Sequence, residues 1–285
     1  MPQRRLPPSL VGLGLVALAA GVGGVASAAA APITARYEVR AAGLVVMRVE
    51  AVFDLDAPGG LYRVGTRIRT TGVVGLLSRS DQVTSVEGRW LDLQPQPLHY
   101  RVEGSWRGAA RRVAIAWTAG GGGMPVVGAL VPPNDSEREA VPPALQRGTM
   151  DALSALAKLT RAVALTGRCD ADAQTFDGRR RADYVVRTAG VDMLPADEGY
   201  AGQALRCAFE SRLIAGRRAD QDPEEARRPV PATAWMAQVA PAPIPVPVRV
   251  DLPSGWFGTI RVHLVGLELG GAFPGGSDQL VQQRR

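Results

Sequence analysis

LYRVGTRIRTT, residues 61–71, alternates between two kinds of side chain. One face is largely apolar and the other largely basic, with Tyr62, Val64, Thr66 and Ile68 on the first and Arg63, Gly65, Arg67 and Arg69 on the second. A period of two residues is typical of a β-strand that buries one face and exposes the other. The preceding DLDAPGG is rich in turn-forming residues. We therefore predict a β-hairpin between residues 44–55 and 61–71.

The same alternation recurs along most of the chain. It is found in PLHYRVEGSW and RRVAIAWTA, which are joined through Gly108, in ALRCAFESRLIAG, in IPVPVRVDL and in GTIRVHLVGLEL. Pro245 and Pro247 lack the amide hydrogen that a β-ladder uses. They predict either an edge strand or a strand whose proline side faces away from its partner. Together these segments indicate an antiparallel sheet of many strands.

The period changes to that of a helix in TMDALSALAKLTRAVALTG, residues 149–167. The expected buried stripe contains Leu153, Leu156, Ala157, Thr160, Val163 and Ala164, and the expected polar stripe contains Asp151, Ser154, Lys158 and Arg161. Thr149 is the expected N-cap, and Gly167 is expected to end the helix. Lys158 is the only lysine of the chain. Its place on the polar stripe predicts a solvated side chain rather than a nucleophile.

The chain has no internal repeat and no linker that would separate two cores, which predicts a single β-rich domain over residues 32–270. Residues 120–146 combine a glycine run with Pro-Pro pairs and are expected to form a surface excursion. The Gly-rich residues 271–285 predict a flexible tail. Many strands and one long helix share an interior if a curved antiparallel sheet wraps around the helix. We therefore expect a mainly β, open half-barrel.

Residues 1–31 have the features of an export signal peptide. Arg4 and Arg5 precede the uncharged stretch SLVGLGLVALAAGVGGVASA, and Ala26-Ser27-Ala28 fits a cleavage site. The alternative is an uncleaved membrane anchor, because the uncharged run is long enough to cross a bilayer. With cleavage, we expect a Sec-dependent route to the periplasm and a mature chain without a transmembrane span.

Cys169 and Cys207 are the two cysteines of the chain. Because exported chains can oxidise their thiols, this pair predicts a disulfide, which would stabilise the fold by about 4 kcal/mol. The alternative is two reduced, buried cysteines. No metal site is expected, because there is no Cys-x-x-Cys and because His99 and His263 lie far from both cysteines in the sequence. We also expect no cofactor.

TFDGRRRADY, residues 175–184, contains an Asp-Gly pair followed by three arginines. Asp177 and Gly178 predict the two-residue turn of a β-hairpin. The expected register pairs Phe176 with Arg179, Thr175 with Arg180, Ala173 with Ala182 and Cys169 with Val186. Such a register places Cys169 on the inward face of its strand. Because Cys207 is also expected to point inward, the two cysteines can meet.

Three residues are predicted as ligand or core contacts. Arg180 lies near the turn on the inward face of the hairpin, and Tyr184 lies on the same face. Trp117 is one of five tryptophans, for which core filling is favoured over the lining of an apolar cavity or a sugar-binding face. The other arginines of the run are expected on the outer face.

Composition and motifs argue against several classes of function. A net charge of +6 and a pI near 10.0 would suit a nucleic-acid ligand, but the arginines are scattered and the chain is expected outside the cytoplasm. A serine hydrolase would need a Gly-x-Ser-x-Gly elbow, which is missing from the sequence. Ser78 or Ser80 with Asp81 and a distant histidine is the remaining arrangement of that kind. An enzyme is therefore not favoured.

The order of these motifs resembles a bacterial exported family called domain of unknown function 3108. The resemblance covers residues 33–268, and its most specific part is the block formed by Cys169, Phe-Asp-Gly-Arg-Arg and Cys207. It implies an exported, β-rich protein whose shape is similar to the half-barrels of lipoprotein carriers and outer-membrane lipoprotein receptors. The family has no established activity, so it supplies no catalytic residues.

We expect a non-enzymatic protein that holds or presents an apolar or lipidated component of the cell envelope, because a concave apolar interior suits such a ligand. One alternative is an envelope hydrolase that acts on glycan or cell-wall material. Another is a structural partner in an envelope complex. A nucleic-acid partner is not expected.

Overall fold

The computed structural model describes residues 31–274, apart from 73–74, 76–77, 119–122, 134–137, 197–198 and 256–257. Most of the predicted signal peptide (residues 1–30) and most of the predicted tail (275–285) lie outside the described residues. Thirteen described strands form one antiparallel sheet in the order β7-β6-β5-β4-β3-β2-β1-β13-β12-β11-β10-β9-β8. The prediction of a mainly β fold with an open antiparallel sheet is confirmed.

The sheet has two halves that meet where the first strand pairs with the last. The first half comprises β1 (Ile33–Ala41), β2 (Leu44–Ala57), β3 (Leu61–Thr70), β4 (Asp81–Leu91), β5 (Gln94–Trp106), β6 (Ala109–Ala116) and β7 (Val126–Val131). The second half comprises β8 (Ala171–Phe176), β9 (Arg181–Leu194), β10 (Gly202–Ala215), β11 (Val230–Ala237), β12 (Val246–Ser254) and β13 (Gly258–Leu269). The described helices are α2 (Pro143–Gln146), α3 (Ala152–Thr166) and α4 (Pro223–Arg227).

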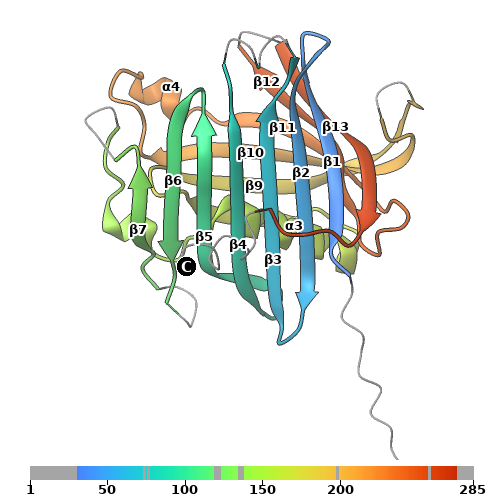
Figure 1. Ribbon diagram of the computed structural model, residues 1–285, viewed down its shortest axis with the longest axis horizontal. Helices are drawn as coiled ribbons and strands as arrows, with labels where there is room; N and C mark the ends of the chain where they lie inside the picture. Colours follow the sequence, from blue (N-terminus) through green and yellow to red (C-terminus); the bar gives the residue numbers. More distant parts are fainter. Residues whose placement is uncertain are drawn as a thin grey trace, which may run out of the picture.

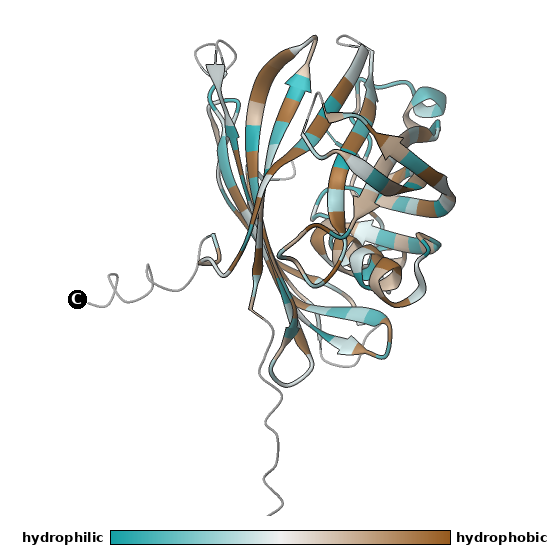
Figure 2. Cartoon of the chain, turned by 90° about the vertical axis from the view of Figure 1, so that its right-hand side faces the viewer, coloured by the Kyte–Doolittle hydropathy of each residue, from teal (hydrophilic) through white to brown (hydrophobic). Residues whose placement is uncertain are grey.

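The two halves form two layers. In Figure 1 the strands β2–β6 stand upright, and β9 and β10 run across behind them. Antiparallel pairing of β1 with β13, from Ile33 opposite Leu269 onward, joins the layers. Figure 2 shows the layers from the side, with apolar and polar residues alternating along strands of both. The sheet therefore folds over on itself.

As the alternation in β3 predicted, the strand buries its apolar face and exposes its basic face. Tyr62 and Val64 are fully buried in the main core. On the opposite face, Arg63 donates to the Asp54 carboxylate at 2.6 Å, and Arg67 binds Asp81 through two hydrogen bonds of 2.9 and 2.8 Å. The predicted hairpin is confirmed, because β2 and β3 pair through a turn at residues 58–60.

The expectation that Pro245 and Pro247 mark an edge strand is wrong, because β12 lies between β11 and β13. Pro247 pairs with Met236 of β11, and the pairing with β13 starts only at Arg249. The prolines therefore precede the part of β12 that has partners on both sides. This agrees with the second alternative, a proline side that faces away from a partner.

The surface excursion predicted for residues 120–146 contains regular structure. Val126 to Val131 form the edge strand β7, which pairs with β6, and residues 143–146 form α2. The sequence did not indicate this strand, because turn-forming residues on both sides leave only the six residues VVGALV, in which apolar and polar residues do not alternate. Residues 119–122 and 134–137 of the segment lie outside the described residues.

The start of the predicted flexible tail packs against the sheet. The guanidinium carbon of Arg63 lies 5.1 Å from the centre of the Phe273 ring. Pro274 lies over Gly65, where an added Cβ would be 3.0 Å from the proline ring. The absence of a side chain at Gly65 therefore makes room for the segment that follows β13.

The helix predicted for residues 149–167 is α3, with 15 residues. Its N-cap is Asp151 rather than Thr149: the Asp151 carboxylate accepts hydrogen bonds from the backbone N–H groups of Leu153 and Ser154. Gly167, with a φ of 65°, ends the helix as predicted. The helix packs against β2, β3, β4, β5 and β8 and thus contacts both halves of the sheet.

The buried stripe of α3 differs from the prediction at its ends. Asp151 and Ser154 are completely buried although they were expected on the polar stripe, and Ala164 is exposed although it was expected in the core. The reason is local: the N-terminus of α3 enters the core beside Tyr62, where the polar groups bond to one another. A periodicity argument cannot distinguish such paired polar groups from solvated ones.

The predicted hairpin around Asp177 exists as β8 and β9, but its register is wrong by two residues. Phe176 pairs with Arg181, and the turn extends from Asp177 to Arg180. The Asp177 carboxylate stabilises this longer turn by accepting from the backbone N–H groups of Arg179 and Arg180, at 2.9 and 2.7 Å. A shift of two residues keeps the side chains of the paired residues in β8 and β9 on their predicted faces, whereas Arg180 now lies in the turn.

Candidate functional site

A cavity of about 220 Å³ lies between α3 and the strands β8–β12. Its lining is predominantly aliphatic and aromatic. It consists of Ala152, Ala155, Leu156, Lys158 and Leu159 of α3, Ala171, Asp172 and Ala173 of β8, Tyr184 and Val186 of β9, Phe209 of β10, Ala234 and Met236 of β11, and Pro247 and Val250 of β12. Only three lining residues carry an ionisable group. The cavity is therefore suited to an apolar group.

The cavity has a closed end and an open end. Its closed end is formed by lining residues that are buried, among them Val186, Ala234 and Met236. The exposed lining residues are Ala152, in the first turn of α3, and Asp172 of β8. The hydrogen bond from Lys158 of α3 to the Asp172 carbonyl of β8 is also exposed, so the opening lies between α3 and β8.

A disulfide between Cys169 and Cys207 packs against the residues that form the closed end of the cavity. Both cysteines are completely buried and pack in one cluster with Val186, Ala234 and Met236, which also line the cavity. The predicted disulfide is confirmed. It joins the segment that leads from α3 into β8 to the middle of β10, two strands away from β8 in the sheet.

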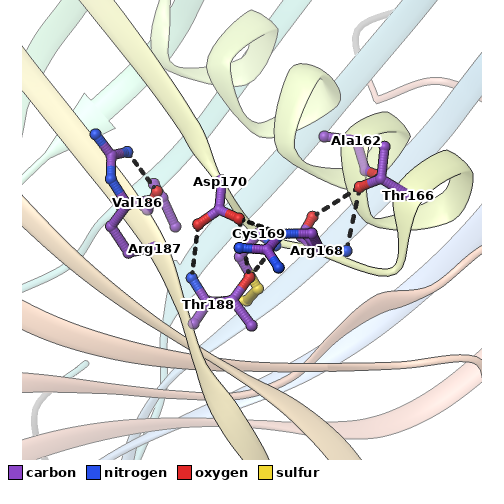
Figure 3. Close-up of polar contacts among 9 residues, drawn as sticks. Ala162, Thr166, Arg168, Cys169, Asp170, Val186, Arg187 and Thr188 are labelled. Carbon is purple, nitrogen blue, oxygen red and sulfur yellow. Dashed lines mark hydrogen bonds and ion pairs between the residues drawn. A yellow bond between two sulfur atoms is a disulfide. The ribbon is translucent and has the colours of Figure 1, made fainter.

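Polar contacts fix the same segment to β9, as Figure 3 shows. The Cys169 amide donates to the Thr188 hydroxyl at 2.9 Å, and the Thr188 amide donates to the Asp170 carboxylate at 3.1 Å. Arg168 donates to the other oxygen of Asp170 at 2.6 Å. The amide and the guanidinium hold the pKa of Asp170 below its usual value. The strand that borders the opening is therefore anchored at its start.

A second polar cluster lies at the N-terminus of α3. The Tyr62 and Ser154 hydroxyls are 2.7 Å apart, and the Ser154 hydroxyl donates to the Asp151 carboxylate at 2.5 Å. Burial raises the pKa of the Asp151 carboxyl, although its hydrogen bonds oppose the shift, and burial also raises the pKa of the Tyr62 hydroxyl. All three residues are completely buried and none lines the cavity. The cluster therefore fixes the helix start to β3.

The sequence matches one family model over most of its length. The model, described as "Protein of unknown function (DUF3108)", matches residues 33–265. The chain belongs to this family. The resemblance inferred from the motifs is thereby confirmed, and it includes the hairpin and both cysteines.

No curated protein matches the DUF3108 chain. Among solved structures it is similar to the "Crystal Structure of Beta-barrel-like Protein of Domain of Unknown Function DUF1849 from Brucella abortus". The two share 15% sequence identity with a TM-score of 0.51, and the match covers 85% of this chain and 99% of that chain. At this identity the similarity shows the fold, which is barrel-like in both proteins.

We predict that Asp151 stabilises the DUF3108 chain by capping α3. Asp151→Ala is expected to lower the free energy of unfolding by about 3 kcal/mol, because it removes the cap and leaves the buried Ser154 hydroxyl short of a partner. Asp151→Asn keeps the acceptor oxygen, so it is expected to cost about 1 kcal/mol. Urea titrations of the two variants and the parent protein measure this difference. Equal losses in both variants would contradict the capping role.

The raised pKa of Asp151 adds a dependence on pH. Between the ordinary carboxyl pKa and the higher pKa in the folded chain, the folded state holds a proton that the unfolded state has released. The stability contributed by Asp151 should therefore fall as pH rises through that window. The difference in unfolding free energy between parent and Asp151→Asn should decrease over the same range, and an increase would contradict the assignment.

The three predicted contact residues lie in three different environments. Tyr184 lines the cavity. Trp117 is buried in the main core and does not line the cavity. Arg180 has a side chain that is 57% exposed and pairs with Asp177 at 2.8 Å, so the buried contact expected for it is wrong.

The two arginines next to Arg180, Arg179 and Arg181, are the buried ones. Arg179 donates to the Pro132 carbonyl beyond β7, and Arg181 donates to the Leu145 carbonyl at 3.0 Å. Because the segment that contains α2 covers the outer face of the hairpin, these side chains are buried there. The prediction placed them in solvent, since it treated residues 120–146 as an excursion away from the sheet.

Several cavity residues could not be predicted from the sequence. Lys158 was expected in solvent, and the sequence ATAWMAQ, residues 232–238, which contains Ala234 and Met236, is compatible with either a short helix or an extended segment. Two signals in the sequence pointed to this cavity: Tyr184 was a predicted contact, and Phe209 alternates in phase with the inward-pointing Cys207 in ALRCAFESRLIAG. Gly216, which follows β10, also has a role that the sequence did not show: a Cβ there would lie 2.0 Å from the Arg179 carbonyl oxygen.

The residues considered for hydrolysis have separate partners. The Ser80 hydroxyl accepts a hydrogen bond from the Arg107 amide at 2.9 Å, and Asp81 binds Arg67. Among the described residues, no group of three or more His, Cys, Asp or Glu side chains could hold a metal ion. Over the same part of the chain, no helix has the length and apolar character needed to span a membrane.

Proposed function

We propose that this DUF3108 chain is a non-enzymatic carrier that binds the apolar chain of a cell-envelope component in the cavity between α3 and β8–β12. The single observation that supports this is the composition of the cavity wall, which is aliphatic and aromatic except for Lys158 and Asp172. A site for polar chemistry would need several converging polar groups. The buried polar cluster of the chain lies elsewhere, at the start of α3.

The volume of the cavity indicates the size of the group that it holds. An apolar protein cavity of about 150 Å³ accommodates benzene, which has six carbon atoms. At the same volume per carbon, about 220 Å³ accommodates roughly nine carbon atoms. A single alkyl chain of that length fits, and the rest of a longer chain would extend through the opening beside β8.

The periplasmic location is part of the proposal. Its support is the export signal predicted for residues 1–31, together with a buried disulfide that requires an oxidising compartment. The periplasm lies between two membranes, where apolar components must cross water. A carrier with one shielded apolar site suits that task.

Binding of a series of straight-chain alcohols tests the function. Each added methylene that enters the cavity should tighten binding about fourfold, because burial of one methylene stabilises by about 0.8 kcal/mol. We expect this gain up to about nine carbons and little gain beyond. Titration calorimetry from butanol to dodecanol measures the trend. If affinity did not depend on chain length, or rose without levelling, the cavity would not be the binding site.

A further inference from the structure

Lys158 is the one cation in the wall of the cavity and the only lysine of the chain. It belongs to α3 and is half-buried. Its ammonium group donates to the backbone carbonyl of Asp172 at 2.7 Å. Because this hydrogen bond between α3 and β8 is exposed to solvent, the ammonium lies at the opening of the cavity rather than at its closed end.

The charges around the opening leave this ammonium with a neutral acceptor. The Asp172 carboxylate is bound by the Arg187 guanidinium, at 2.6 and 3.3 Å. Arg187 also holds the pKa of Asp172 below its usual value, so the carboxylate stays ionised. Burial lowers the pKa of Lys158, and the nearby Asp172 charge only partly opposes this. An additional anion beside Lys158 would favour its charged form.

We propose that Lys158 binds the carboxylate of a single-chain fatty acid whose alkyl chain occupies the cavity. The inference rests on the proposed function, because it assigns the head group of the same ligand. The closed end takes the apolar chain, and the cation at the opening lies where the polar end of that chain emerges. Lysine binds a carboxylate as a compact charge with several donors, and such charge-assisted bonds are stronger than neutral ones.

The surroundings favour a monoanion with one chain. One ammonium lies at the opening, so a single negative charge finds a partner there and a second would have none among the lining residues. The volume for roughly nine carbons leaves no space for a second alkyl chain. A lipid with two chains would therefore keep one of them in water.

The test compares decanoate with decanol on the parent protein and on two variants. Lys158→Met keeps the apolar stem and removes the charge, and Lys158→Arg keeps the charge. We expect the parent to bind decanoate at least about tenfold more tightly than decanol at pH 7 and low salt. Lys158→Met should weaken the binding of decanoate about tenfold and change the affinity for decanol less than about twofold. Lys158→Arg should retain most of the preference for decanoate.

The outcomes separate the two proposals. If decanol binds the parent as tightly as decanoate, or if Lys158→Met weakens both ligands equally, the Lys158 assignment is overturned while the apolar cavity stands. If neither ligand binds the parent protein, both the assignment and the proposed function are overturned. Thermal unfolding of each variant without ligand shows that the fold is intact, so a loss of decanoate binding reports on the head-group contact.

Discussion

Replacing Cys169 and Cys207 together by alanine is expected to lower the free energy of unfolding by about 4 kcal/mol. The disulfide closes a loop with a sequence separation of 38 residues, and its loss restores the freedom of that loop in the unfolded chain. Both cysteines are completely buried beside the closed end of the cavity, so the substitution also removes packing there. Urea titration of the variant and the parent, with the same buffer and probes, measures the loss.

Reduction of the parent protein provides the control. Reduced parent protein keeps the sulfur atoms and loses only the covalent link, so it should account for most of the 4 kcal/mol. A free-thiol assay on the unfolded, unreduced protein should find no thiol. A loss below about 1 kcal/mol, or two reactive thiols, would contradict the role assigned to the disulfide.

Ala155→Phe is expected to weaken binding of a ten-carbon chain at least about 100-fold. Ala155 lines the cavity from α3, and a phenyl ring would take the space of about six of the roughly nine carbon atoms that the cavity accommodates. The same ring fills empty apolar space, so the free energy of unfolding should stay equal or rise. Titration calorimetry with decanol and a urea titration of the same preparation measure both effects.

Ala164→Phe is the matched control. Ala164 lies on the same helix but is exposed to solvent, so the larger side chain should leave both ligand affinity and stability nearly unchanged. Equal affinities in the Ala155→Phe variant and the parent would show that the ligand binds elsewhere. A similar loss in both variants would point to a change in the helix rather than in the cavity.

Local patterns in the sequence were sufficient for most strands. The alternation in residues 61–71 predicted both the strand β3 and its buried face, because the pattern depends only on which side of one strand faces the core. The register of the β8–β9 hairpin was wrong, because the Asp177 side chain stabilises a longer turn than an Asp-Gly pair suggests. The side chains of the paired residues in β8 and β9 still lie on their predicted faces, because a shift of two residues does not change the face.

The cavity could not be predicted because it is made by segments far apart in the chain. Its walls come from α3 and five strands, β8–β12, which are brought together only when these strands pair in the sheet and α3 packs against β8. Lys158 shows the difficulty best. On the isolated helix Lys158 belongs to the polar stripe. Only the packing of β8 against α3 places its side chain beside an apolar cavity. The buried Asp151 was missed for a similar reason, since its partner Ser154 binds Tyr62 from the sheet.

Native mass spectrometry of the protein purified from its own host tests the carrier function. We expect the parent protein to retain a small apolar molecule that lipid extraction recovers, and the Ala155→Phe variant to be purified without it. The protein mass in the same spectrum also reports whether residues 1–31 have been removed. A parent protein that carries no bound mass, with an extract that matches that of the Ala155→Phe variant, would contradict the carrier function.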